Sequence, residues 1–118
     1  AAVYDRLLAK GPIKPVLPVP NEKPAYYKYM ALLPEKVNRA ALKERLKKES
    51  GVSLAGEVYA TPLTKQPFFR DNPNVLAAPL APAPVAEMVA ERQICLPIWP
   101  GLTAEAQEYA VDRLLKAL

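Results

Sequence analysis

The chain has 118 residues, a mass of 13.0 kDa and 51% apolar residues, which suits one packed domain and is too short for two. There is no histidine and only one cysteine, which excludes a Ser-His-Asp triad, a Cys-His dyad, a His-ligated or Cys-clustered metal site and an internal disulfide. The net charge of +4 is mildly basic. The composition therefore predicts a globular domain without the common kinds of self-contained active site.

The chain begins with apolar residues at helical spacing, namely Val3, Tyr4, Leu7 and Leu8. This pattern predicts a helix to about Lys10, followed by Gly11 in a left-handed position and by Pro12, which blocks continuation. Because the pattern starts without a capping residue or an initiating Met, we expect a chain cut in mid-helix. Residues 12–24 hold five prolines and predict a stiff, extended connector.

Residues 26–33 predict a strand that ends at Pro34. Alternate residues should share its buried face, namely Tyr27, Tyr29, Ala31 and Leu33. The next segment predicts a helix between an N-cap at Asn38 and Gly51, with Val37 and Leu42 as a hydrophobic staple. Its buried stripe should consist of Ala41, Leu42 and Leu46.

Residues 52–60 predict a second strand, with a bulge or bend at Gly56. Residues 61–82 follow as a long, proline-rich irregular loop, and such loops are usually functional or lie against a partner. A helix from Pro84 should bury Val85, Met88 and Val89. Residues 94–98 predict a third strand, and Thr103 should cap the last helix. The apolar stripe of that last helix comprises Ala110, Val111, Leu114, Leu115 and Leu118.

This order of elements predicts an α+β fold with a small, mostly antiparallel sheet and helices packed on one face. The longest apolar stretch, residues 75–86, is interrupted by prolines. It is too short to span a membrane, since a transmembrane helix needs about 20 apolar residues. With a single cysteine and no leader, we expect a cytoplasmic location.

The residues show no complete catalytic, cofactor-binding or metal-binding constellation. Cys95 lies between Ile94 and Leu96, and a buried, inert thiol is expected there. The basic residues of the helix after Asn38 are interrupted by glutamates, which favours a solvated face over a nucleic-acid patch. The tyrosines at 26, 27 and 29 could stack bases, but the core face of a strand accounts better for half of such an alternating set.

Three stretches together resemble one family: residues 27–35 with 38–42, residues 59–69, and residues 90–103. They are similar to the C-terminal region of the DegT/DnrJ family of aminotransferases, which use pyridoxal 5′-phosphate (PLP). The most telling element is Leu96-Pro97 followed by residues 100–103 (PGLT) before a helix. The order and spacing of the stretches agree over nearly the whole chain.

The resemblance implies the C-terminal small domain of a fold-type I PLP enzyme. Residues 1–11 would be the end of the inter-domain helix, residues 12–25 the connector, and residues 61–82 a loop on the side of the active site. The large PLP-binding domain, with the Schiff-base lysine, would lie outside this chain, which would then hold no cofactor and show no catalysis. In the family the full-length enzymes are expected to form homodimers and to transfer an amino group, usually from glutamate, to a nucleotide-linked keto sugar.

The resemblance also indicates substrate-binding residues. The family's loop from a tyrosine to "PLH–x–QP" lies near the substrate side of the cleft, and it is matched here by Tyr59, residues 62–63 and residues 66–67. Thr64 stands where the family usually has histidine, and a threonine cannot titrate near pH 7. Tyr59, Thr64 and Gln66 are thus the candidate substrate contacts, although packing under the loop explains Tyr59 equally well.

Two other functions stay open at this point. A free-standing interaction module would use residues 61–82 and the proline connector for docking, and its exposed apolar surface would cause self-association. A small nucleic-acid-binding domain would instead show an affinity that falls steeply with salt.

Overall fold

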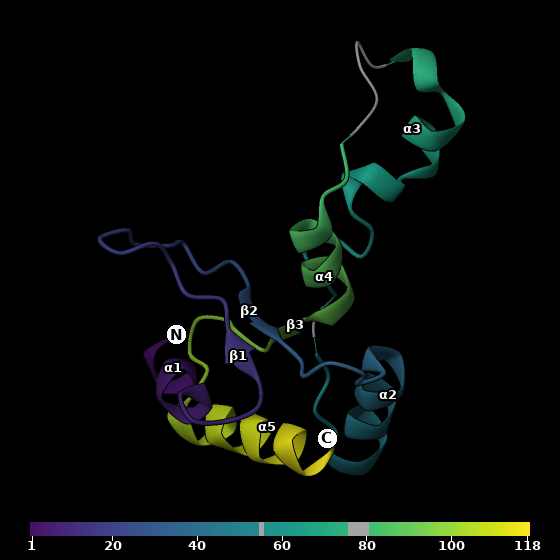
Figure 1. Ribbon diagram of the computed structural model, residues 1–118. Helices are drawn as coiled ribbons and strands as arrows, with labels where there is room; N and C mark the ends of the chain where they lie inside the picture. The colour runs from purple at the N-terminus through teal and green to yellow at the C-terminus, as the bar shows by residue number, and fades with distance from the viewer. Residues whose placement is uncertain (55, 76–80) are drawn as a thin grey trace.

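The computed structural model describes residues 1–54, 56–75 and 81–118. Its centre is a three-stranded antiparallel sheet in the order β1-β2-β3 (Figure 1). The strands are β1 (Lys14–Pro15), β2 (Tyr29–Leu32) and β3 (Gln93–Leu96). In the register, Pro15 lies opposite Ala31, and Ala31 lies opposite Ile94. The predicted α+β class with a small antiparallel sheet is confirmed.

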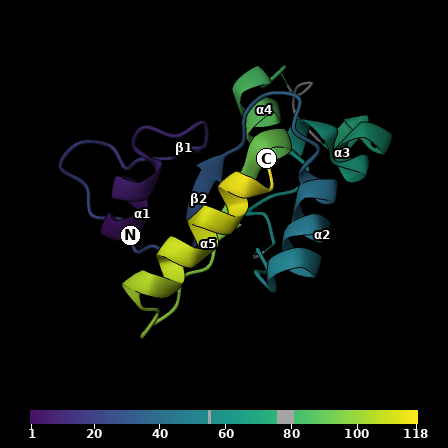
Figure 2. The same cartoon turned by 90° about the horizontal axis from the view of Figure 1, so that it is seen from below.

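Three helices pack around the inner side of this sheet: α1 (Ala2–Leu8), α2 (Arg39–Ser50) and α5 (Ala104–Lys116). Seen from below in Figure 2, α5 crosses β2, with α1 on one side and α2 on the other. The core between them is built from fully buried side chains, namely Tyr4, Leu8, Ile13, Leu33, Leu46, Ile94, Leu96 and Leu114. Removing this apolar surface from water is the main driving force of the fold.

The remaining helices lead away from the core. They are η1 (Leu63–Lys65), α3 (Pro67–Asp71), η2 (Pro73–Val75) and α4 (Pro84–Arg92). Figure 1 shows that α4 rises from β3 on the side opposite α5, and that α3 lies beyond it. We call the described residues 61–75 and 81–83 the arm. The predicted irregular loop 61–82 is therefore wrong in its described part, which contains short helices; residues 76–80 lie outside the described residues.

The helix caps are formed by the residues that the sequence predicts. Asn38 accepts a hydrogen bond from the Ala41 N–H (3.0 Å), and Gly51 ends α2 with φ +72°. Thr103 Oγ1 accepts from the Ala106 N–H (3.2 Å) and begins α5. These local predictions are confirmed because a cap needs only residues within one helical turn.

Three predictions about helix surfaces and ends are wrong. Gly11 is not left-handed, because α1 already ends at Leu8 and the Gly11 N–H closes a tight turn onto the Leu8 carbonyl (3.1 Å). Ala41 is exposed, since α2 meets the core through Leu42 and Leu46. The buried faces of α4 and α5 contain fewer residues than predicted, because the predicted members Val85, Leu115 and Leu118 are exposed.

The strand predictions need correction as well. Tyr26 has a positive φ of 48°, which breaks the alternation, so Tyr27 is exposed and the strand begins only at Tyr29. The connector is not merely a spacer, because residues 14–15 pair with β2 as an edge strand. Pro15 is tolerated there because one side of an edge strand needs no ladder hydrogen bonds.

The predicted strand 52–60 is absent among its described residues, which are irregular. In this segment, backbone N–H and C=O groups that would bond a neighbouring strand are hydrogen-bonded to side chains instead. The Gln93 side chain bonds the backbone of Val58 and Tyr59, and the Lys28 ammonium donates to the carbonyls of Gly56 and Glu57. In the part of the chain that the structure describes, no helix is both long and apolar enough to cross a membrane.

Candidate functional site

A pocket of about 590 Å³ lies where the arm meets the sheet and α4. Among the described residues that line it, none carries a charge, and its wall is Met30, Val58, Tyr59, Thr61, Pro62, Leu63, Gln66, Ala86, Val89, Ala90 and Gln93. Largely apolar walls with a few polar groups are typical of sites that bind small molecules. We call this cavity the Tyr59 pocket.

Two of the three predicted substrate contacts line the pocket. Tyr59 is 74% exposed, so its ring stands at the rim and is not packed under the loop. Gln66 donates from Nε2 to the Thr61 carbonyl (3.1 Å), which folds the start of the arm back on itself. Tyr59 and Gln66 therefore lie in the wall of the same pocket.

The third predicted contact, Thr64, lies in η1 and is not part of the pocket wall. Its hydroxyl oxygen is buried, and it has no hydrogen-bond partner within the described ranges. A buried hydroxyl without a partner costs free energy. Thr64 is thus not among the residues that line the Tyr59 pocket, whereas its neighbours Leu63 and Gln66 are.

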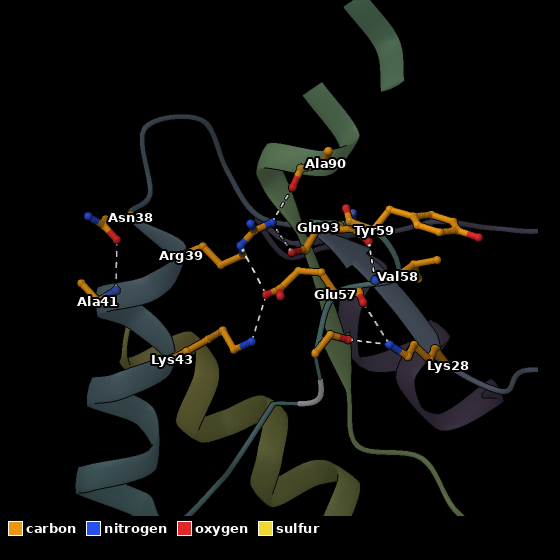
Figure 3. A network of polar contacts seen from close by, with 11 residues as sticks. Lys28, Asn38, Arg39, Ala41, Lys43, Glu57, Val58, Tyr59, Ala90 and Gln93 are labelled. Atoms are coloured by element: carbon orange, nitrogen blue, oxygen red, sulfur yellow. Dashed lines mark hydrogen bonds and ion pairs between the residues drawn. The ribbon is translucent and has the colours of Figure 1, made fainter. Parts of the chain in front are cut away.

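The segment that carries Tyr59 is fixed by one side-chain amide (Figure 3). Gln93, at the start of β3, is 2% exposed. Its Oε1 accepts from the Val58 N–H (3.0 Å), and its Nε2 donates to the Tyr59 carbonyl (2.7 Å). One amide therefore satisfies a backbone donor and a backbone acceptor of adjacent residues, as a neighbouring strand would do.

Glu57 anchors the same segment to α2. Lys43 Nζ lies 2.9 Å and Arg39 Nε 3.4 Å from Glu57 Oε1, and the Glu57 side chain is 17% exposed. The hydrogen bond from the Lys43 ammonium is the main cause that holds the pKa of the Glu57 carboxyl below its usual value. Arg39 also donates from Nη1 to the carbonyls of Ala90 (2.6 Å) and Gln93 (3.1 Å). The anchor thus joins α2, the end of α4 and β3.

This arrangement bears on the nucleic-acid alternative. Arg39 and Lys43, two of the basic residues of α2, point toward Glu57 in Figure 3. Cations that are paired in this way contribute little to the concentrated positive field that nucleic-acid binding needs. The solvated face of α2 therefore keeps fewer basic groups than the sequence suggests.

Two other expectations concern reactive groups. Cys95 is buried in β3, and burial raises the pKa of its thiol, which agrees with an inert cysteine. In the ranges that the structure describes, no group of three or more His, Cys, Asp and Glu side chains is placed to hold a metal ion.

Sequence reasoning missed Gln93 and Glu57. Gln93 meets its partners across 34 and 35 residues of chain, and no local pattern reports such a contact. One signal was present, because Gln93 is the polar member of a strand that is otherwise apolar, and buried polar groups are normally hydrogen-bonded. Glu57 gave no comparable signal.

Comparison with known proteins agrees with the resemblance found in the sequence. Residues 1–115 match the model of the DegT/DnrJ/EryC1/StrS aminotransferase family. No curated protein matches the chain. A DegT DnrJ EryC1 StrS aminotransferase from Brucella abortus is similar in structure, with a TM-score of 0.73, 22% identity, and coverage of 94% of this chain and 27% of that chain.

Two further solved structures are similar. PseC from Helicobacter pylori, an aminotransferase involved in the biosynthesis of pseudoaminic acid, has a TM-score of 0.78 and 23% identity, and the match covers 98% of this chain and 30% of that one. The aminotransferase TlmJ from Streptoalloteichus hindustanus has a TM-score of 0.72 and 23% identity, with coverage of 97% and 28%. The chain thus spans less than a third of each of these solved chains, whose fold it shares in that part. Because the family model matches almost from end to end, the chain belongs to the DegT/DnrJ/EryC1/StrS aminotransferase family.

Proposed function

We propose that this chain is the C-terminal small domain of a PLP-dependent aminotransferase. The enzyme transfers an amino group from glutamate to the keto carbon of a nucleotide-linked sugar, in the biosynthesis of an amino sugar. The observation that carries the proposal is the family match over residues 1–115, in a chain that spans less than a third of similar aminotransferases. A biosynthetic role is supported by the similar PseC from Helicobacter pylori, an aminotransferase involved in the biosynthesis of pseudoaminic acid.

PLP supplies the electron sink for amino-group transfer when it is bound to an enzyme lysine. The Tyr59 pocket does not fit this cofactor, because its described wall holds neither a lysine for the Schiff base nor a cation for the phosphate. Two lysines that are close in the chain to lining residues serve other groups, since Lys28 bonds backbone carbonyls and Lys65 pairs with Glu87 (2.8 Å). We therefore place PLP in a large domain outside these residues, and we expect no catalysis by the 118-residue chain itself.

Within this assembly, residues 1–11 form the end of the inter-domain helix, residues 12–25 the connector and residues 61–82 the loop on the side of the active site. Tyr59 and Gln66 bind the acceptor substrate, the first through its exposed ring and hydroxyl and the second through its amide. Thr64 contributes at most a hydrogen bond, because a threonine cannot exchange a proton near pH 7. The whole enzyme is expected to be a cytoplasmic homodimer.

The proposal is tested on the native gene product that contains this chain. We expect a subunit several times heavier than 13.0 kDa, the visible absorption of bound PLP, and conversion of a nucleotide-linked keto sugar to its amino sugar with glutamate, followed by mass spectrometry. Tyr59→Phe, which removes one hydroxyl, should raise the KM of the keto acceptor about fivefold and leave the KM of glutamate unchanged.

Two results would contradict the proposal. A native subunit near 13.0 kDa without bound PLP would favour a free-standing interaction module. Absorption of lysine-bound PLP by the isolated 118-residue chain would contradict the location of the cofactor in a separate large domain.

A further inference from the structure

The backbone that carries Tyr59 lies next to β3 but does not pair with it as a strand would. Residues 56–60 are irregular, although Val58 and Tyr59 are hydrogen-bonded to Gln93 of β3. The hydrogen bonds that such a strand would supply come from the Gln93 side chain, which reaches Val58 and Tyr59 in Figure 3. At Val58 and Tyr59 themselves, the backbone is therefore held by the Gln93 side chain.

Gln93 is well suited to this task because its amide is almost completely shielded from water. At 2% exposure, both amide atoms need partners, and the Val58 N–H and the Tyr59 carbonyl satisfy them. If the segment moved, the amide would lose these bonds without gaining water, which is costly. The same two bonds thus fix the segment and oppose its displacement.

A second anchor restrains the segment from the opposite side. Glu57 is held by Lys43 and Arg39 of α2, and Arg39 also bonds the Gln93 carbonyl. The main chain of Gln93 and its side chain are therefore connected to the same network. Residues 57–59 are held between α2 and β3, while the Tyr59 ring projects away from the network in Figure 3.

We propose that Gln93 is a positioning residue for acceptor binding. Its amide fixes the backbone of Val58 and Tyr59, so that the exposed Tyr59 ring stands at the rim of the pocket in the orientation that meets the keto acceptor. Gln93 itself does not react. This inference rests on the proposed function, and it concerns the half-reaction with the acceptor and not the half-reaction with the amino donor.

The test replaces Gln93 by methionine, which has a similar shape and cannot form either bond. In the full-length protein, Gln93→Met should speed hydrogen exchange at the Val58 amide and raise the KM of the keto acceptor, each by about fivefold to tenfold. The single-turnover rate with glutamate should stay within about twofold, because the donor half-reaction does not need this segment. The matched control is Gln107→Met on α5, whose amide bonds the Leu102 and Thr103 carbonyls far from the pocket and should change none of these values.

A second variant distinguishes the loss of the two hydrogen bonds from a general loss of folding. In Gln93→Glu, a protonated carboxyl group has one donor and one acceptor, as the amide has, whereas the carboxylate only accepts. Protection of the Val58 amide, corrected for its intrinsic exchange rate, should therefore return as the pH falls in this variant and should not return in Gln93→Met. Such a pH-dependent rescue is not expected if Gln93 merely fills space.

Two outcomes would overturn the inference. Unchanged exchange at Val58 in Gln93→Met would show that the amide does not fix the segment. Faster exchange with an unchanged acceptor KM would show that the fixation has no role in binding. Failure of the wild-type protein to react with glutamate would instead overturn the proposed function, and the exchange experiment would still decide whether Gln93 holds the segment.

Discussion

At Glu57 a single carboxylate connects the segment before the pocket to α2. Its pKa is lowered in the folded protein, so its contribution to stability is present above the unfolded pKa of about 4.3 and is lost as the pH falls through the folded pKa. We predict that Glu57→Gln lowers the free energy of unfolding by about 1.5–3 kcal/mol at pH 7, since it weakens charge-assisted hydrogen bonds. The difference from the wild type should shrink toward zero as the pH falls below the folded pKa. Urea unfolding across this pH range measures it.

The control for this prediction is Glu49→Gln, since Glu49 is also a glutamate but lies on the exposed face of α2. It should change stability by less than about 0.5 kcal/mol at every pH. If Glu57→Gln and Glu49→Gln behave alike, the anchor between Glu57, Lys43 and Arg39 does not contribute to stability.

At the scale of one element, the glycine that ends α2 and a second glycine in the irregular segment after it form a matched pair. Gly51 ends the helix with φ +72°, a conformation that residues with a Cβ rarely adopt, whereas Gly56 does not have a positive φ. A Cβ would meet nothing within 4 Å at either position. Gly51→Ala should therefore lower the free energy of unfolding by about 1–2 kcal/mol through backbone strain alone. Gly56→Ala should be neutral or slightly stabilising, and thermal unfolding of both variants compares them.

The elements also show what the sequence can predict. Asn38, Gly51 and Thr103 were predicted because caps are local, and β3 was predicted because an apolar run bounded by prolines is local too. Residues 52–60 were expected to be a strand from their composition, but composition does not report that Gln93 and Lys28 take over their backbone groups. Tyr59 and Gln66 came from the family resemblance, whereas Gln93, which holds the Tyr59 segment, lies in a distant part of the chain and needed the structure.

For the whole molecule, the shape departs from that of a compact domain. The radius of gyration is 16.4 Å, whereas a compact chain of this length has about 13.5 Å. Figure 1 shows the reason, since the arm and α4 extend away from the helices that surround the sheet. Large apolar side chains stay exposed along the arm and α4, namely Leu63, Phe68, Val75 and Val85. Exposed apolar groups of this kind mark surfaces that contact another part of an assembly.

This shape leads to a prediction for Phe68, which lies in α3 and is 58% exposed. Phe68→Ser should change the free energy of unfolding of this domain by less than about 0.5 kcal/mol, because few core contacts are lost. Burial of a phenylalanine against a partner contributes about 1.5–3 kcal/mol, so the same change should lower kcat/KM for the acceptor in the full-length enzyme by tenfold or more. Leu118→Ser, at an exposed position beyond α5, is the control and should leave both values unchanged. Equal activities of the two variants would mean that the arm contacts neither the acceptor nor the rest of the enzyme, and its extension would then have no part in catalysis.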